Sequence, residues 1–258
     1  MSILNEVKIL YEDNDVLVIN KPAGLAVHAD GRTEEKTLAD WVLTHYPEMK
    51  DVGEQKIQNE ELEIKNQELN RSSDIPRPGI VHRIDRDTSG ALILAKNQKA
   101  FEYLKSQFKN RTVRKEYYCF VYGSIDDNFG TIDRPIGRSR SDFRKWSAET
   151  GARGELRDAV TYFEVIKHGK EVTFIRVLPK TGRTHQIRVH FKAIHHPIVA
   201  DALYAPKKEK LLGFQRVALH AYSLEFKDLS GKTVVVTAPY PADFEHAVTE
   251  FDKENNVA

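Results

Sequence analysis

The sequence predicts an α+β protein in which a mixed, largely antiparallel central sheet is flanked by helices. Two observations support this class: many short apolar runs are separated by turn residues, and a few segments with helical spacing lie between them. The chain has 258 residues, of which 40% are hydrophobic, which is enough to bury a sizeable core. We expect residues 1–258 to form a single domain without internal repeats.

The amino-terminal segments are predicted to form two strands and one helix. Residues 7–22 (VKILYEDNDVLVINKP) read as a strand, a polar turn and a second apolar strand that is closed by a proline. Residues 37–46 have apolar side chains at helical spacing behind a threonine that can cap the first turn, so we expect a helix there. Residues 50–78 are polar and rich in Glu, Asn and Gln, and we expect them to be a mobile insertion.

The rest of the chain is predicted to alternate strands, hairpins and helices. The predicted strands and hairpins lie at 91–96, 113–125, 130–137, 158–180 and 217–241. The predicted helices lie at 97–111, between Thr184 and Ile194, and at 242–254. The basic stretch that ends at Arg157 is predicted to be a loop.

Composition places the chain among ordinary globular proteins of a reducing compartment. Its net charge is +1, so the chain as a whole gives no argument for a polyanionic partner. The single cysteine, Cys119, excludes a disulfide framework. The amino terminus lacks a basic region followed by an apolar stretch, and no window approaches the ~18 apolar residues of a membrane span. We therefore expect a cytoplasmic protein without membrane association.

The charge is unevenly distributed along the chain. Residues 134–157 contain seven Arg and Lys against three Asp and Glu, whereas residues 54–71 contain five Glu against three Lys and Arg. A neutral chain can therefore carry a basic face that suits a nucleic-acid partner, although a solvated loop explains such a run equally well.

The stretch HRIDRDTSG at residues 82–90 contains two aspartates between arginines. An Asp-x-Asp-x-Thr pattern can serve metal-dependent phosphoryl transfer, but the flanking arginines would compete with a metal cation and favour an ion-paired carboxylate. His185 and His190 are five residues apart, which does not place them on one helical face as zinc ligands. Ser89 lacks the Gly-x-Ser-x-Gly elbow of a serine nucleophile, and the sequence has no glycine-rich phosphate loop. We expect no metal and no nucleotide cofactor.

Four stretches, in this order, resemble the motifs of the RluA-type pseudouridine synthase family. They are NKPAGLAVH (20–28), HRIDRDTSGALILAK (82–96), KEYYCFVYG (115–123) and LPKTGRTHQIRVHFKAIHHPIVADALY (178–204). VALHAYSLEF (217–226) is similar to the last core motif of the family, and the resemblance spans roughly residues 8–245. It implies the pseudouridine synthase fold and an enzyme that isomerises specific uridines of ribosomal or transfer RNA to pseudouridine.

The resemblance assigns the chemistry to one carboxylate and implies no cofactor and no metal. Asp85 matches the catalytic aspartate of the family, and the sequence leaves open whether it attacks as a nucleophile or removes a ribose proton. By resemblance, Arg183 is its partner, because a guanidinium group lowers the pKa of a nearby carboxyl group. Asp87 is expected to hydrogen-bond the turn that follows.

Further residues are implied to bind the substrate. Tyr117 matches the tyrosine that stacks on the target base, while Tyr118 should point to the other face of its strand. A stacked uridine must be flipped out of the RNA to reach a pocket, and Arg83 is implied to fill the vacated space. The remaining candidates for substrate binding are His82, Arg86, Ile187 and Leu219.

The basic stretch is expected to hold the RNA, with Phe143 and Trp146 stacking on loop bases. The expected phosphate contacts are Arg138, Arg140, Arg144 and Lys145. We expect a monomer without the amino-terminal RNA-binding domain of many family members. An RNA-binding or ribosome-assembly module without catalysis is the alternative, but such a module has no need for the carboxylate of Asp85.

The sequence departs from the family pattern at two glycine positions and in one insertion. His195 and Ala200 stand where glycines are usual, and we expect His195 to give up a positive φ and Ala200 to crowd a close approach, with catalysis retained. The acidic stretch 54–71 is longer than the usual link and is either a specificity insertion or a disordered segment.

Overall fold

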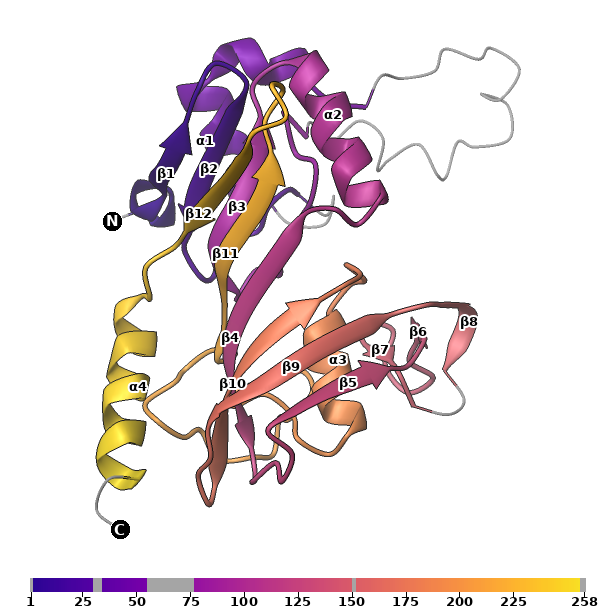
Figure 1. Ribbon diagram of the computed structural model, residues 1–258, viewed down its shortest axis with the longest axis vertical. Coiled ribbons are helices and arrows are strands. Elements are labelled where there is room, and N and C mark those ends of the chain that lie inside the picture. Colours follow the sequence, from indigo (N-terminus) through magenta and orange to yellow (C-terminus); the bar gives the residue numbers. More distant parts are fainter. Residues whose placement is uncertain (1, 30–33, 55–76, 150–151, 256–258) are drawn as a thin grey trace.

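The computed structural model contains a nine-stranded sheet whose two ends form two lobes, joined through the long strands β4 and β11 (Figure 1). It describes residues 2–29, 34–54, 77–149 and 152–255. The strands of this sheet are β1 (Lys8–Glu12), β2 (Val16–Lys21), β3 (Ser89–Ala95), β4 (Arg114–Tyr122), β5 (Phe129–Asp133), β9 (Val160–Lys167), β10 (Val172–Pro179), β11 (Leu219–Lys227) and β12 (Thr233–Thr237). The α-helices of the described residues are α1 (Leu38–His45), α2 (Gln98–Lys109), α3 (Gln186–Ala193) and α4 (Ala242–Asn255), and short 3-10 helices lie at Ile3–Glu6 and Pro47–Asp51.

Most neighbouring strands run antiparallel. Their order is β1-β2-β3-β11-β4-β10-β9-β5, and β12 pairs with the second half of β11. Among the described strands, only β3 and β11 pair in parallel, with Ser89 opposite His220 and Gly90 opposite Ala221. The mixed, largely antiparallel sheet with flanking helices that the sequence predicts is confirmed.

Gly90 allows β3 and β11 to approach each other closely. Its φ is +117°, and a Cβ atom at this position would overlap the carbonyl group of Ala221. Any side chain would both strain the backbone and collide with the neighbouring strand, so the position requires glycine. This contact places the turn that precedes β3 beside the beginning of β11.

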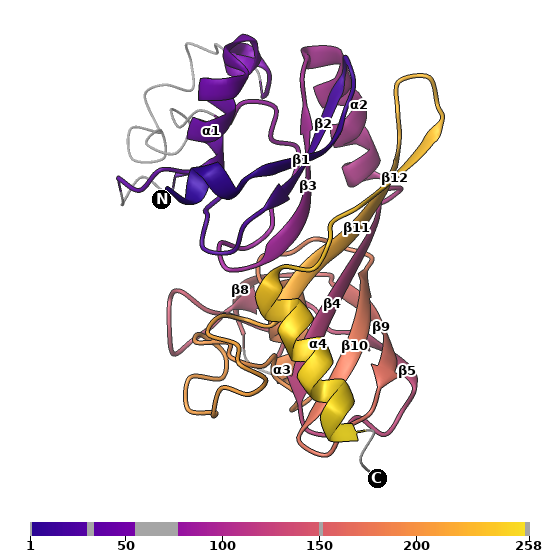
Figure 2. The same ribbon diagram turned by 90° about the vertical axis from the view of Figure 1, so that its left-hand side faces the viewer.

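Helices α3 and α4 cover opposite faces of the lobe that contains β5, β9 and β10 (Figure 2). On one face, Phe120 of β4 packs against Phe244 of α4, with ring centroids 5.5 Å apart. On the other face, Phe163 of β9 packs against Phe191 of α3 at 5.6 Å. Because side chains alternate along a strand, Tyr117 of β4 lies on the α3 face.

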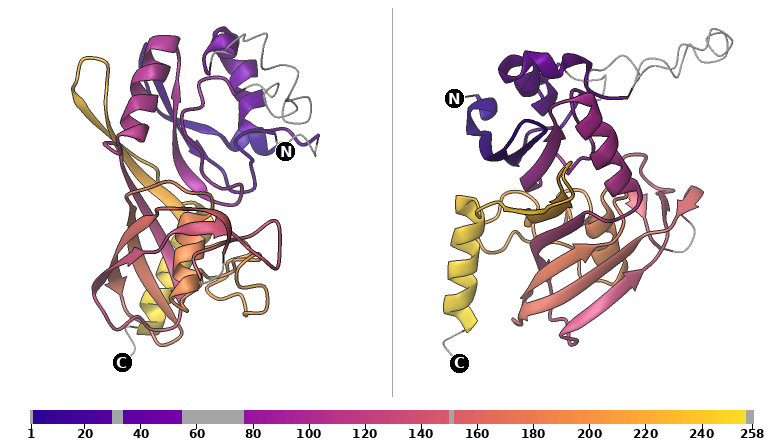
Figure 3. Two further views of the ribbon diagram at one scale, coloured as in Figure 1. Left: turned by 90° about the vertical axis from the view of Figure 1, so that its right-hand side faces the viewer. Right: turned by 45° about the horizontal axis from the view of Figure 1, so that its top comes forward.

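In the other lobe, α2 packs along β3, and its last turn lies near the junction of the two lobes (Figure 3).

Capping side chains determine where two helices begin. The Asp40 carboxylate accepts hydrogen bonds from the backbone N–H and Oγ1 of Thr37, both at 2.8 Å, in the first turn of α1. The Asn97 side chain accepts from the backbone N–H of Ala100 at 2.9 Å at the start of α2. No described helix is both long and apolar enough to cross a bilayer.

Two expectations are wrong. The basic stretch that ends at Arg157 is not a loop, because it contains an antiparallel sheet of β6 (Ile136–Arg138), β7 (Trp146–Ser147) and β8 (Arg153–Arg157). These strands are short, and β8 is exposed throughout, so they lack the apolar alternation of a half-buried strand. His195 and Ala200 keep left-handed backbones, with φ of 69° and 55°, contrary to the expectation that His195 gives up a positive φ.

The expected mobile insertion at 50–78 lies mostly outside the described residues. At its described ends, 50–54 and 77–78, Val52 and Pro78 are buried, and the carbonyl of Val52 accepts a hydrogen bond from the N–H of Gly79 at 2.7 Å.

Candidate active site

Asp85 lies on the turn that precedes β3, at the junction of the two lobes. The N–H of Thr88 donates to the Asp85 carbonyl at 3.1 Å, which closes the turn, and the buried side chain of Ile84 anchors it. The Asp85 side chain is 18% exposed. Its carboxylate is therefore sheltered by the fold and still accessible to a ligand.

A buried lysine connects this turn to the amino-terminal NKPAGLAVH motif. Lys21 is fully buried, and its Nζ donates to the carbonyl oxygens of Pro22, Leu25 and Arg86 at 2.8, 2.7 and 2.9 Å. An ammonium group has three N–H donors, so the three carbonyls match it. Burial lowers the pKa of Lys21 to about 7, while the two aspartates of the turn act to raise it.

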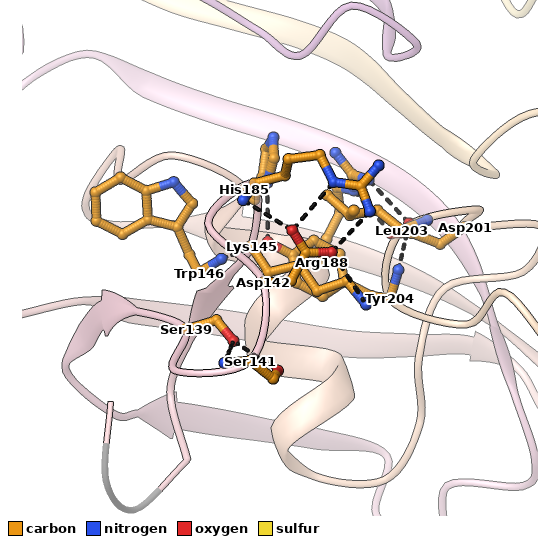
Figure 4. Close-up of polar contacts among 11 residues, drawn as sticks. Ser139, Ser141, Asp142, Lys145, Trp146, His185, Arg188, Asp201, Leu203 and Tyr204 are labelled. Atoms are coloured by element: carbon orange, nitrogen blue, oxygen red, sulfur yellow. Dashed lines mark hydrogen bonds and ion pairs between the residues drawn. The ribbon is translucent and has the colours of Figure 1, made fainter. Parts of the chain in front are cut away.

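Arg188 is the partner of Asp85. Its Nη1 donates to Asp85 Oδ2 at 3.0 Å. Its Nε and Nη2 donate to the two carboxylate oxygens of Asp201 at 2.7 and 2.8 Å (Figure 4). The Arg188 side chain is 10% exposed and that of Asp201 is 0% exposed. Burial acts to lower the pKa of Arg188, but the bonds to both carboxylates outweigh it and raise the pKa above its ordinary value.

The expected pairing of Arg183 with Asp85 is therefore wrong. Arg183 precedes α3, and its Nε donates to the carbonyl of Asp158 at 3.1 Å. Arg188 lies on α3 itself, which orients it toward the Asp85 turn. Both arginines belong to the same motif, and spacing alone cannot tell which of them reaches an aspartate a hundred residues away.

His185 and Tyr204 extend this polar network. The sequence indicates a hydrogen-bonding or RNA-facing histidine at position 185 and no role for Tyr204. His185 Nε2 lies 4.0 Å from Asp85 Oδ1, and its Nδ1 shares a hydrogen bond of 2.9 Å with the Tyr204 hydroxyl. The same hydroxyl accepts a hydrogen bond from the backbone N–H of Trp146 at 3.0 Å (Figure 4). Burial lowers the pKa of His185, although the charge of Asp85 acts to raise it. Its φ of 55° is a left-handed backbone that no sequence pattern announces.

Three buried side chains add apolar surface to the cavity that contains the carboxylate. Tyr117 of β4, Ile187 of α3 and Leu219 of β11 are buried and line the same cavity as Asp85. Burial, assisted by the negative charge of Asp85, raises the pKa of Tyr117, so its hydroxyl stays protonated at neutral pH. Tyr118 lies on the opposite face of the strand, in an aromatic cluster with ring centroids 4.9–5.7 Å apart.

The cavity has a volume of about 490 Å³. This volume lies within the range of small-ligand sites. Its described lining residues include seven Arg and Lys, and Asp85 is the only carboxylate among them. The cavity can therefore hold an anionic ligand and present one carboxylate to it.

Two of the basic residues in HRIDR line this cavity. The Nε2 of His82 accepts from the N–H of Ile93 at 3.0 Å, and burial lowers the pKa of His82 to about 3, so the ring is neutral. Arg83 is exposed, and its Nη1 lies 3.1 Å from the Nε2 of His28. Their contact with a substrate stays a prediction.

Arg86 holds the NKPAGLAVH loop and is not among the residues that line the cavity. Its Nε donates to the carbonyl of Gly24 at 3.0 Å, and its Nη2 lies 3.0 Å from the carboxylate of Glu35. The expected contact between Arg86 and the substrate finds no support in this position. Asp87 contributes to the turn through its backbone carbonyl, which accepts from Arg216 Nη1 at 3.1 Å.

The basic stretch forms a separate surface on the small sheet. The Arg138 guanidinium lies 4.1 Å from the ring centroid of Trp146, a cation–π contact. Arg144 donates twice to the Asp142 carboxylate, at 3.0 and 2.8 Å. The four expected phosphate contacts, Arg138, Arg140, Arg144 and Lys145, are all exposed or half-buried. They are accessible to a large ligand.

Over the described residues, no three His, Cys, Asp or Glu side chains are grouped so that they could hold a metal ion. The neighbours of Asp85 are the guanidinium of Arg188 and the ring of His185. This donor set suits an anion or a neutral ligand better than a cation.

Comparisons with known proteins agree with this geometry. The family model described as RNA pseudouridylate synthase matches residues 15–193. An uncharacterized RNA pseudouridine synthase of Synechocystis is 36% identical over 92% of this chain, which spans 66% of the length of that relative. The ribosomal large subunit pseudouridine synthase D of Xanthomonas campestris is 34% identical over 96% of this chain and 70% of its own length. The structure of human RNA pseudouridylate synthase domain containing 1 covers 93% of this chain and 86% of its own, with a TM-score of 0.69 and 27% identity.

The matched region contains the residues that the fold brings together. Asp85, Tyr117 and Arg188 all lie within residues 15–193 and line one cavity. The family match covers more than half of the chain, and both relatives are more than 30% identical to it. The chain belongs to the RluA type of the RNA pseudouridine synthase family, which is a family of enzymes.

Proposed function

We propose that this chain isomerises specific uridines in ribosomal or transfer RNA to pseudouridine, with Asp85 as the catalytic residue and the target nucleotide flipped out of the RNA. The observation that carries the proposal is the solitary carboxylate: among the described lining residues of the cavity, only Asp85 supplies one. Detaching uracil from ribose and reattaching it through carbon 5 requires one nucleophile or base and no net oxidation.

The geometry around Asp85 supports this role. Arg188 binds Oδ2 at 3.0 Å, which leaves Oδ1 as the oxygen that can approach the ribose. The guanidinium also places a fixed positive charge beside a carboxylate that must be ionised to act. Both possible first steps, attack by the carboxylate and removal of a ribose proton, use this same oxygen.

The surrounding side chains suit a flipped pyrimidine base. Tyr117 offers a neutral aromatic ring, and Ile187 and Leu219 add apolar surface beside the carboxylate. Flipping a base costs a few kcal/mol of stacking and pairing. The exposed guanidinium of Arg83 lines the cavity and has the planar shape that stacks in the vacated space.

The small sheet is proposed to hold the RNA around the target. Arg138, Arg140, Arg144 and Lys145 would contact phosphates, which carry no sequence information but set the position of the RNA. The name of the Xanthomonas relative refers to the large ribosomal subunit, and this supports ribosomal RNA as the first substrate to examine.

Release of tritium from carbon 5 of labelled uridine in RNA tests the proposal. Wild-type protein should release tritium from ribosomal or transfer RNA, and Asp85→Ala should lower kcat by roughly 10³-fold or more, because the described residues that line the cavity include no second carboxylate.

Asp87→Ala is the matched control. Asp87 belongs to the same Asp-Arg-Asp stretch, but it is exposed and serves the turn through its backbone carbonyl. It should retain activity within about threefold of the wild type. Equal tritium release by wild type and Asp85→Ala would refute the catalytic assignment.

A further inference from the structure

The active-site cavity is lined by five basic side chains without an acidic partner among the described residues. These five, called the cation cluster below, are Lys109, Arg111, Lys115, Lys180 and Arg183. They come from the end of α2, from β4 and from the connection between β10 and α3. None of them forms an ion pair with another described residue, whereas Arg188, which lines the same cavity, is bound by two carboxylates.

The cluster lies close to the place proposed for the target base. Lys115 and Tyr117 project from the same face of β4, two residues apart, which corresponds to roughly 7 Å along a strand. Tyr117 lies beside Asp85 in the cavity wall. A nucleotide whose base rests on Tyr117 can therefore extend its sugar and phosphate toward Lys115.

Lys115 and Arg111 lie close enough to repel each other. Burial, and to a smaller degree the positive charge of Arg111, lowers the pKa of Lys115 to about 8. Lys115 Nζ donates to the carbonyl of Thr181 at 2.9 Å, and its other two N–H groups can serve a ligand. An anionic group between the two side chains would relieve this repulsion.

The backbone at Arg111 does not favour arginine. Arg111 follows the last residues of α2 with a left-handed φ of 60°, and its N–H donates to the carbonyl of Phe108 at 3.2 Å. The N–H of Thr112 donates to the carbonyl of Gln107 at 3.0 Å, so the helix ends in a Schellman motif. The left-handed position of this motif is usually glycine, because other residues are strained there. The end of α2 therefore does not explain why residue 111 is an arginine. The cavity explains it, because the Arg111 side chain lines the cavity.

We propose that the cation cluster binds a backbone phosphate of the substrate RNA, next to the nucleotide whose base faces Asp85. The inference rests on the proposed function for the identity of the RNA, and it adds a phosphate site inside the cavity that is separate from the small sheet. Several cations converging on one phosphodiester fix the position of the strand without reading its sequence.

The decisive variant is Arg111→Gly, because it should move binding and stability in opposite directions. Loss of the guanidinium should weaken RNA binding at low salt by roughly fivefold and reduce the slope of log Kd against log salt by about 0.7, the value for one phosphate contact on a single strand. Relief of the left-handed backbone should leave Tm unchanged or raise it by up to about 4 °C. KM should rise, and kcat at saturating RNA should stay within twofold.

Two further variants show whether the effect comes from losing a cation in the cavity. One removes a cavity cation without changing the backbone, and the other removes a cation outside the cavity. Lys180→Gln removes an exposed cation of the cluster without any change of backbone strain, and it should also lower the salt slope. Arg114→Gln is the matched control: Arg114 is 80% exposed, lies 3.6 Å from Glu225 and does not line the cavity, so its substitution should leave the slope unchanged.

A neutral methylphosphonate, placed at one linkage after another along the RNA, identifies the phosphate. At one linkage beside the target uridine, the methylphosphonate should weaken binding of the RNA to the wild type. The same methylphosphonate should not weaken binding to Arg111→Gly any further. The proposal is overturned if Arg111→Gly keeps the wild-type slope of log Kd against log salt. It is also overturned if Arg111→Gly loses the binding of inorganic phosphate, measured by calorimetry, while its affinity for RNA is unchanged. If the wild type releases no tritium from any RNA, the proposed function fails, and the salt slope still tests the cluster.

Discussion

Two Arg–Asp pairs in this protein have the same geometry and opposite surroundings. Arg188 binds Asp201 through Nε and Nη2 at 2.7 and 2.8 Å, and Arg144 binds Asp142 through the same two nitrogens at 3.0 and 2.8 Å. The Arg188 side chain is 10% exposed, whereas that of Arg144 is 65% exposed.

Burial decides what each pair can do. The buried pair is expensive to break, because either partner alone would be an unpaired charge, so it holds Arg188 in place for Asp85. In the other pair only Arg144 is exposed, since Asp142 is 17% exposed, but water and salt reach the guanidinium and screen the pair, so it contributes little to stability. A phosphate can therefore replace Asp142 as the partner of Arg144. The same two residue types can therefore hold the proposed catalytic carboxylate in position at one site and remain available to a ligand at the other.

The largest expected effect is that of Arg188→Met, which leaves Asp201 buried without its partner. Removal of one partner from such a pair typically costs about 3–5 kcal/mol. The free energy of unfolding of a whole domain is about 5–15 kcal/mol, so this loss is a large part of it. We expect a clear fall in the urea midpoint, together with loss of tritium release. Arg183→Met should change the free energy of unfolding by less than about 0.5 kcal/mol, because its guanidinium bonds only a carbonyl.

The double variant Arg188→Met/Asp201→Asn separates stability from catalysis. The amide that replaces the Asp201 carboxylate would carry no charge, and its oxygen would still accept from the backbone N–H groups of Leu203 and Tyr204. The double variant should recover much of the lost stability and none of the activity. Wild-type turnover in Arg188→Met would contradict the role assigned to Arg188.

Acidification should destabilise the fold through its buried histidines. Burial lowers the pKa of His82 to about 3 and that of His220 to about 4, from an ordinary value of 6.5. Below pH 6.5 the unfolded chain takes up protons that the folded chain refuses, so the free energy of unfolding falls as the pH falls toward the folded pKa values. The loss is at most about 2 kcal/mol per histidine at pH 5. Urea unfolding at pH 7 and pH 5 measures it.

Substitution locates the source of this pH dependence. His82→Gln retains an acceptor for the N–H of Ile93 and should flatten the pH dependence of stability by about one histidine. His168→Gln alters an exposed residue and should leave it unchanged. An identical pH dependence in wild type and His82→Gln would exclude His82 as a contributor.

The smallest expected effect is that of a substitution in the Arg144–Asp142 pair. Asp142→Asn frees Arg144 and removes a negative charge from the basic surface, so RNA binding at low salt should tighten by roughly twofold to fivefold. Stability should change little. Fluorescence anisotropy with labelled RNA at about 50 and 200 mM salt measures the change, and the gain should shrink at the higher salt. A gain independent of salt would argue against release of Arg144.

Much of the fold was predictable because its signals are local. Helical spacing predicts α1 and α2, with a capping threonine as a second signal for α1, and apolar runs bounded by turn residues predict β3, β4 and both hairpins. The small sheet was missed, because its strands are short, β8 is exposed throughout, and their pairing is set by contacts that sequence alternation does not report. The left-handed backbone at His195 escaped for a similar reason: the surrounding structure imposes it.

The site was predictable as a set of motifs and not as a set of contacts. Asp85 and Tyr117 lie in recognisable stretches, and the structure places both in one cavity. The predicted partner of Asp85, Arg183, was wrong. The choice between Arg183 and Arg188 depends on where α3 begins relative to the Asp85 turn. A basic residue inside a helix, next to buried apolar neighbours, was the available signal for Arg188, since a buried arginine needs acidic partners.

The position of β11 constrains how the protein is made. This strand lies in the middle of the sheet, between β3 and β4, yet it follows β3 by some 130 residues in the chain. At a synthesis rate of about 5–20 residues per second, β3 waits roughly 7 to 26 s for its parallel partner. Until then the edges of β3 and β4 that β11 will cover are open to wrong partners. Variants that slow this closure should increase aggregation of the nascent chain even where the finished protein is as stable as the wild type.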